Sequence, residues 1–266
     1  MSADQRPPSP GRLTGWRPET GPGLTEAGRL LATTELTVEG RLPWSSNLTF
    51  LVRLEGTGRD TSRGDPAAAP LLAVYKPHRG ERSLWDFPGG LYRREVAAHA
   101  LSEALGWSLV PPTVLRHDGP FGVGSVQLFV EADYERHYFT LLEEGGHEDV
   151  LTTFCAFDVV ANNADRKSGH VLLAPDGRLW GIDHGLCFHT QRKLRTVIWD
   201  FAGEVVPPGI LADLERFLSC DLPDALCELL DGTERSSLLE RAARLVRDGV
   251  FPDPVGDRPP YPWPLV

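Results

Sequence analysis

Lysine is scarce in this sequence, and its scarcity is informative. Only three of the 27 basic residues are lysines, namely Lys76, Lys167 and Lys193. A chain that uses Arg almost everywhere keeps Lys by chance, or at positions that need a compact ammonium instead of a planar guanidinium. The three lysines are therefore candidates for functional positions, although one lysine alone would not exclude chance.

Cysteine is also rare, and its spacing excludes two classes of protein. The four cysteines contain no CxxC pair, so they match neither a zinc site nor a disulfide framework. Cys155 and Cys227 lie in apolar, helix-like surroundings. We therefore expect reduced thiols in a cytoplasmic protein.

Long apolar runs and excess positive charge are missing as well. The first 23 residues contain no apolar segment, and no run reaches the roughly 18 apolar residues of a membrane span, so we expect neither a signal peptide nor a transmembrane segment. The formal net charge of −10 argues against a nucleic-acid partner that is bound through overall basicity. Peripheral contact with a membrane stays open.

The order of predicted elements divides the chain into a β-rich half and a helical half. A chain of 266 residues with 41% hydrophobic residues can bury a substantial core. We predict an N-lobe over 24–132, a C-lobe over 133–250, a disordered tail over 1–23 and a Pro-rich tail without regular structure over 251–266. Residues 55–70 read as a surface insertion. Periodicity and turn signals predict strands at 35–40, 47–54, 71–75, 110–119 and 124–132, helices at 91–106, 150–163, 209–220, 222–230 and 234–249, and a hairpin at 170–183.

The stretch VVANNADRKSGHVLL, residues 159–173, concentrates polar groups on one short turn. Asp165 lies on the loop before the hairpin, and Asp183 ends it, which places two carboxylates near one point. Asp165 could accept the proton of an attacking hydroxyl, and Asp183 could hold Mg²⁺ against phosphates. A lone Asp before a turn is more often a turn former, but the combination favours a site.

Lys76 and Glu95 are a second pair with a possible shared role. Lys76 ends a predicted strand, and Glu95 follows on the next helix. A buried Lys needs a carboxylate partner, and such a pair can hold the α- and β-phosphates of ATP. Two solvated surface charges are the alternative, which this pair considered alone would favour.

Five segments carry a resemblance to a known family. They resemble, in order, successive motifs of the phosphatidylinositol 3-/4-kinase-like superfamily, closest to the type II phosphatidylinositol 4-kinases and related bacterial proteins. The resemblance extends from about residue 36 to about residue 215, and it implies an α+β, two-lobed protein-kinase-like fold. It also implies an ATP-dependent kinase with Mg²⁺ or Mn²⁺ as cofactor. The segments are LAVYKPHRGERSLWDFP, YRREVAAHALSEALGWSLVPPT, VGSVQLFVEAD, FDVVANNADRKSGHVLL and WGIDHGLCF.

The resemblance implies a role for each matching residue. Lys76 would bind the α- and β-phosphates, and Glu95 would orient it. Asp165 would be the catalytic acid/base residue, with Arg166 positioning its loop, and Asp183 would hold the metal. Further nucleotide contacts would come from the loop residues Ser45 and Ser46 and from the hinge residues Phe129, Val130 and Glu131.

One position departs from the family pattern. The residue five after the catalytic Asp is usually an Asn that binds a second metal ion, and here it is His170. Imidazole prefers softer ions than Mg²⁺, so the second metal site would be weakened, tolerant of Mn²⁺ or absent. An attenuated, nucleotide-binding pseudokinase is therefore one alternative. A metal-dependent hydrolase is another, with Asp165, His170, Asp183, His184 and His189 as its metal-binding cluster.

The acceptor of the phosphate is not identified by sequence. Arg192, Lys193 and Arg195 lie where the resemblance places an activation loop that meets the acceptor. These basic residues would suit an anionic acceptor, or they are a solvated loop. A lipid headgroup, a protein and a small molecule remain possible as hydroxyl acceptors.

Overall fold

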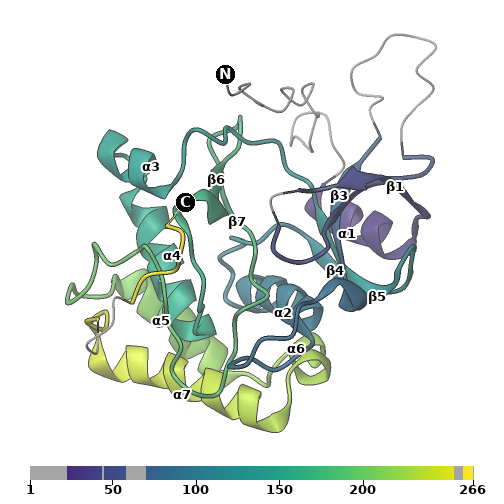
Figure 1. Ribbon diagram of the computed structural model, residues 1–266. Coiled ribbons are helices and arrows are strands. Elements are labelled where there is room, and N and C mark those ends of the chain that lie inside the picture. The colour runs from purple at the N-terminus through teal and green to yellow at the C-terminus, as the bar shows by residue number, and fades with distance from the viewer. Residues whose placement is uncertain (1–22, 44, 58–69, 255–259, 266) are drawn as a thin grey trace.

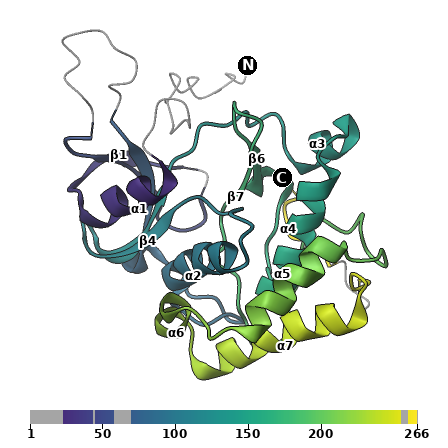
Figure 2. The same cartoon turned by 180° about the vertical axis from the view of Figure 1, so that it is seen from behind.

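The computed structural model describes residues 23–43, 45–57, 70–254 and 260–265. The predicted disordered tail over 1–23, apart from Gly23, and most of the predicted insertion at 55–70 lie outside these residues. The described part confirms the predicted fold class, because a β-rich lobe and a mainly helical lobe pack side by side (Figure 1; Figure 2 shows the reverse side).

The β-rich lobe is built on one antiparallel sheet of five strands. The strand order is β1-β2-β3-β5-β4. Apolar side chains of the central strands point into a common core that includes Val52, Tyr75 and Val126. The strands are β1 (Leu36–Arg41), β2 (Phe50–Leu54), β3 (Leu72–Pro77), β4 (Thr113–Gly119) and β5 (Gly122–Leu128).

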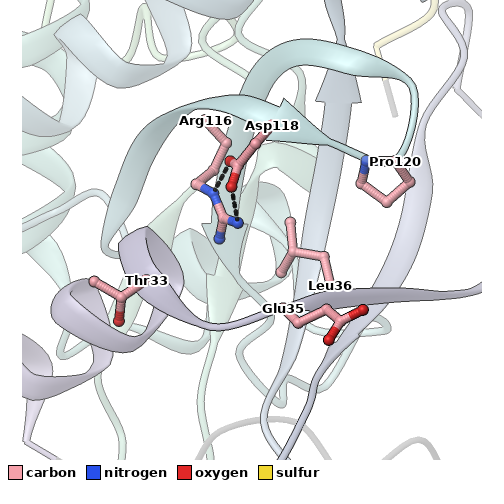
Figure 3. Close-up of a pocket in the computed structure, with 6 residues that line it drawn as sticks. All are labelled: Thr33, Glu35, Leu36, Arg116, Asp118 and Pro120. Atoms are coloured by element: carbon pink, nitrogen blue, oxygen red, sulfur yellow. Dashed lines mark hydrogen bonds and ion pairs between the residues drawn. The ribbon is translucent and has the colours of Figure 1, made fainter.

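A helix that sequence analysis missed, α1 (Leu24–Thr33), packs against this sheet with Ala27 and Leu31 buried. Arg116 of β4 holds its C-terminal end, because its guanidinium donates to the carbonyls of Leu31 and Thr34, each at 2.8 Å. The same guanidinium pairs with Asp118. Figure 3 shows this pair in a pocket of about 380 Å³. Arg116 is thus engaged through all three nitrogens and fastens α1 to the sheet.

Helix α2 (Leu91–Ala104) lies between the sheet and the helical lobe in both views (Figures 1 and 2). Its Val96, Ala97 and Leu101 are buried in the large helical core, as the predicted apolar face requires. The chain leaves the helix through Gly106 with a φ of +76°, a left-handed conformation that favours glycine.

The helical lobe includes a short hairpin. The three helices predicted near the end of the chain are confirmed, and α5 packs against α7. A further short helix, α3, precedes the long buried helix α4. The elements are α3 (Tyr138–Glu144), α4 (Glu148–Ala161), the hairpin β6 (Val171–Leu173) and β7 (Leu179–Gly181), α5 (Pro208–Ser219), α6 (Asp224–Leu229) and α7 (Gly232–Asp248).

The cores of the two lobes interleave instead of separating at one residue. Leu172, Ala174 and Trp180 of the hairpin pack into the core of the sheet, whereas α2 contributes to the helical core. A buried ion pair between Arg94 of α2 and Glu234 of α7 links α2 further to the helices. The two lobes therefore share core elements, and residues from both can meet at one site. The predicted boundary at residue 132 stays a prediction.

Candidate active site

Lys76, Glu95 and Asp183 meet where the sheet, α2 and the hairpin come together. The Lys76 ammonium donates to Glu95 Oε1 and, at 2.8 Å, to Asp183 Oδ1, which is 107 residues away in sequence. Burial alone would lower the pKa of Lys76, but the two carboxylates outweigh it and raise the pKa above its usual range. Lys76 is thus a permanently charged group between two acids.

Glu95 also fixes the chain around Asp183. Its second oxygen, Oε2, accepts a hydrogen bond of 2.9 Å from the backbone N–H of His184. One buried carboxylate thus positions both the ammonium of Lys76 and the residue after Asp183.

Asp183 has the geometry and charge of a cation ligand. It leaves the hairpin with a φ of +60°, and its side chain is 49% exposed although Lys76 and His170 flank it. The Lys76 ammonium holds the pKa of Asp183 well below its usual range, so the carboxylate is ionised. Its exposed oxygen could bind Mg²⁺ or Mn²⁺.

Asp165 combines a fixed position with an unusual pKa. Its N–H donates to Asn163 Oδ1 at 3.0 Å, and its Oδ2 lies 3.3 Å from Lys167 Nζ. Burial raises the pKa of Asp165 to about 6; Lys167 opposes this, while the negative charge of Asp183 adds to it. Such a carboxylate is ionised at neutral pH and basic enough to take a proton.

Arg166 is fully buried and joins α4 to the polar turn over 162–170 that carries Asp165, which we call the catalytic loop. It pairs with Asp158 of α4 at 2.9 Å, and neither side chain is exposed. Its guanidinium also donates to the carbonyls of His170 and Ile182, each at 3.3 Å. The guanidinium of Arg166 is thus enclosed by the protein, and its role in positioning the loop of Asp165 stays a prediction.

Asp158 and His184 complete this buried network. Asp158 had no predicted role, and His184 was predicted only as a metal ligand of the hydrolase alternative. His184 Nε2 lies 2.7 Å from Arg166 Nη2, and burial lowers the pKa of His184 well below its usual value, so the ring is neutral and accepts this hydrogen bond. The signal for Asp158 was present, since a carboxylate inside a predicted buried helix requires a cationic partner.

The two asparagines of the polar turn fix the surrounding backbone. Asn162 ends α4 with a φ of +53°. Its side chain donates to the carbonyls of His189 and Gln191 and accepts from the N–H of Lys193. Asn163 donates to Asp158 Oδ1 at 2.9 Å. The turn therefore has a structural reason for its polar side chains besides carrying Asp165: Asn162 binds the segment 189–193, and Asn163 binds α4.

His170 lies beside Asp183, with 3.5 Å between its Nε2 and Asp183 Oδ2. Burial is the largest cause of a pKa of about 4 for His170, and nearby cations lower it as well, so the imidazole is neutral at pH 7. Metal binding by His170 together with Asp183 stays a prediction.

The histidines of the hydrolase hypothesis do not join one cluster. His184 is bound to Arg166, and the ring of His189 packs against Phe87 with 5.1 Å between ring centroids. Within the described residues, no group of three or more His, Cys, Asp or Glu side chains is arranged to hold a metal ion. The arrangement therefore disfavours a hydrolase with that cluster.

The predicted hinge connects the sheet to the hairpin. The N–H of Phe129 donates to Leu72 O at 3.0 Å, and the N–H of Asp133 donates to Leu173 O at the same distance. Val130 between them is buried in the core of the sheet. Adenine recognition by Phe129, Val130 and Glu131 stays a prediction.

The predicted phosphate loop connects β1 and β2, as expected from sequence. Ser45 and Ser46 lie in this connection, which is tied to the chain after β3 by a hydrogen bond of 3.0 Å from Leu48 N to Gly80 O. Phosphate binding by Ser45 and Ser46 stays a prediction.

The three basic residues of the predicted activation loop are engaged within the protein. Lys193 pairs with Asp86 at 3.3 Å, Arg195 donates to Ala164 O at 2.8 Å, and Arg192 donates to Asp253 O at 3.3 Å. These residues hold their segment in place, which limits their availability for an anionic acceptor.

The sequence is similar to that of three known proteins. No family model matches the sequence. Protein Rv2133c of Mycobacterium tuberculosis is 39% identical over 272 residues, which cover 88% of this chain and 94% of that protein. Phosphatidylinositol 4-kinase gamma 4 of Oryza sativa subsp. japonica is 28% identical over 186 residues, 54% of this chain. Phosphatidylinositol 4-kinase gamma 3 of Arabidopsis thaliana is 25% identical over 229 residues, 66% of this chain. The matches cover only 32% and 39% of the two plant proteins.

Among solved structures, the Golgi casein kinase with Mn/ADP bound superposes with a TM-score of 0.52 at 13% identity, covering 84% of this chain and 74% of that one. At this identity the likeness establishes the kinase fold. Within the described residues, none of the helices is long and apolar enough to cross a membrane.

Proposed function

Because this chain belongs to the family of the mycobacterial protein Rv2133c and to the phosphatidylinositol 3-/4-kinase-like superfamily, we propose that it is an ATP-dependent phosphotransferase. It transfers the γ-phosphate of ATP to a hydroxyl acceptor. The observation that carries the proposal is the contact of Lys76 with Glu95 and Asp183. An ammonium held between two carboxylates, near an ionised Asp165, suits the binding of a nucleoside triphosphate.

Lys76 would bind the α- and β-phosphates while Glu95 keeps it oriented. Asp183, with His170 beside it, would hold Mg²⁺ or Mn²⁺. The bound cation would neutralise the charge of the phosphates. Most of the catalysis would come from positioning and charge neutralisation, because phosphoryl transfer requires little covalent chemistry from the protein.

Asp165 would act on the acceptor. As the acceptor oxygen forms its bond to the γ-phosphorus, the bond to the β-phosphate oxygen breaks and ADP leaves. The proton of the acceptor hydroxyl passes to the Asp165 carboxylate, whose raised pKa suits it to receive one. Arg166, paired with Asp158, keeps the loop in place during the transfer.

The acceptor is defined only as a hydroxyl compound: a lipid headgroup, a protein or a small molecule. The plant relatives are named as phosphatidylinositol 4-kinases, but this chain spans about a third of their length. We place the protein in the cytoplasm, a proposal supported by the four cysteines, which are free thiols.

A thermal shift experiment tests nucleotide binding. ATP with Mg²⁺ or Mn²⁺ should raise the melting temperature, because a ligand at about 100 times its dissociation constant stabilises the folded state by about 2.7 kcal/mol. Adenosine, which lacks the phosphates, is the matched control and should give a smaller shift. Equal shifts with ATP and adenosine would contradict the proposed role of Lys76, Glu95 and Asp183, which we call the Lys76 cluster.

The second candidate is an attenuated nucleotide-binding pseudokinase, which His170 favours. If His170 only weakens metal binding, His170→Asn should increase ATP turnover with Mg²⁺ several-fold, since an amide oxygen suits Mg²⁺ better than imidazole does. Turnover would be measured with Mg²⁺ and Mn²⁺ separately, with His117→Asn at an exposed position as the control. No phosphotransfer from either His170→Asn or the wild type would favour the pseudokinase.

A further inference from the structure

The chain beyond α7 returns to the catalytic loop. The sequence predicts a Pro-rich tail over 251–266 without regular structure. Its described parts are irregular, but they pack closely against the site. In Figure 1 the yellow segment near the C label passes close to α4, the helix that leads into the catalytic loop.

The first part of this return pairs with the segment before α5. Hydrogen bonds run from Gly203 N to Phe251 O at 3.1 Å, from Phe251 N to Glu204 O at 2.9 Å and from Val206 N to Gly249 O at 3.0 Å. Phe251 is only 1% exposed and belongs to the helical core. This part of the chain is therefore firmly anchored.

The second part, residues 260–265, reaches the two segments that surround Asp165. Pro260 O accepts hydrogen bonds from Thr196 N at 3.0 Å and from Trp199 Nε1 at 3.2 Å. Leu265 O accepts a hydrogen bond of 2.8 Å from the N–H of Ser168, three residues after Asp165. We call residues 260–265 the strap.

Both contacts of the strap adjoin the buried network of Arg166, Asp158 and His184, which we call the catalytic network. Thr196 forms a parallel bridge with Arg166, and its hydroxyl donates to Asp158 Oδ2 at 3.0 Å. Ser168 is fully buried in the turn that joins Asp165 to His170. The strap therefore holds the catalytic loop through the backbone of the loop itself and through the segment paired with it.

We propose that the strap is a positioning element of the active site, which keeps Asp165 aligned for transfer. Its carbonyls accept hydrogen bonds from the backbone of Ser168 and Thr196 and from the indole of Trp199, whereas Lys76 is bound to Glu95 and Asp183. Loosening the strap should therefore lower kcat and leave nucleotide affinity nearly unchanged. The expected fall in kcat rests on the proposed function, whereas the attachment of the loop by the strap does not.

The strap supplies its own matched pair of variants. Pro262 is buried, whereas its neighbour Trp263 is 88% exposed. Pro262→Asp places a charge in the buried position and should detach the strap, while Trp263→Asp adds the same charge where it meets solvent. Neither residue contributes a side chain to the Lys76 cluster or to the catalytic network.

Two measurements on the full chain test the inference. The first is ATP hydrolysis with Mg²⁺ or Mn²⁺ and without added acceptor. Pro262→Asp should lower kcat about tenfold, in line with the cost of a slightly misplaced catalytic group, and change KM for ATP by less than about twofold. The second is amide hydrogen exchange, which should accelerate at Ser168 and Thr196 because both amides lose their acceptors. Trp263→Asp should match the wild type in both.

Unchanged exchange at Ser168 and Thr196 in Pro262→Asp would overturn the strap itself. Faster exchange with unchanged kcat would overturn its positioning role. A fall in kcat accompanied by an equal rise in KM and a large loss of melting temperature would also overturn it, because that pattern indicates general destabilisation. If the wild type hydrolyses no ATP and ATP with Mg²⁺ or Mn²⁺ gives no thermal shift, the proposed function and the positioning role fail together, whereas the exchange result still decides whether the strap holds the loop.

Discussion

Asp165→Asn is expected to lower kcat for phosphotransfer about a thousandfold while leaving ATP binding almost intact. Asparagine keeps the size of the side chain but cannot take the proton of the acceptor, and general base catalysis contributes about 10² to 10⁴ in rate. Turnover would be measured together with the thermal shift by ATP and Mg²⁺, which should match that of the wild type. Asp149→Asn, at an exposed position in the first turn of α4, is the control. Full activity in Asp165→Asn would remove Asp165 from the mechanism.

The same carboxylate predicts a pH dependence. Burial raises the pKa of Asp165 to about 6, and only the ionised form can accept a proton. The value of kcat/KM should therefore rise with pH up to about 6 and level off above it. The residual rate of Asp165→Asn should lack this step, which separates the titration of Asp165 from that of ATP itself.

Lys76→Met is expected to weaken ATP binding at least about tenfold and to lower kcat/KM more than a thousandfold. The substitution removes the ammonium from the phosphates, and it also leaves Glu95 and Asp183 without the cation between them. ATP affinity and turnover would be measured by calorimetry and an ADP-release assay. Arg79→Ala, at an exposed basic position after β3, serves as the control for loss of positive charge.

Lys76→Arg sharpens this prediction. If the site requires a compact ammonium, as the scarcity of lysine indicates, Arg should fail to restore turnover although it keeps the charge. Turnover near the wild-type level in either Lys76 variant would contradict the assigned role.

The sequence was sufficient for the parts of the site that follow from local patterns. Lys76 at a strand end, Glu95 on the next helix and Asp183 after a hairpin could each be placed on an element, and family resemblance brought them together. The structure places their side chains in contact. The hairpin and α2 followed from turn signals and from apolar periodicity.

The remaining parts depend on tertiary contacts that leave weak local signals. Helix α1 is short, and its end is held by Arg116, which lies 82 residues after Thr34 in the sequence. The neutral state of His184 follows from burial beside Arg166. The strap bonds through backbone carbonyls, so its side chains give no indication of its partners. Such features are fixed by packing between distant segments and not by the residues alone.

A structure of the protein with a non-hydrolysable ATP analogue and Mn²⁺ tests the central claim most directly. The account predicts the triphosphate between the lobes, with Lys76 on the α- and β-phosphates, Mn²⁺ on Asp183 and the γ-phosphate facing Asp165. A triphosphate bound away from Lys76, or a metal ion that does not touch Asp183, would contradict it.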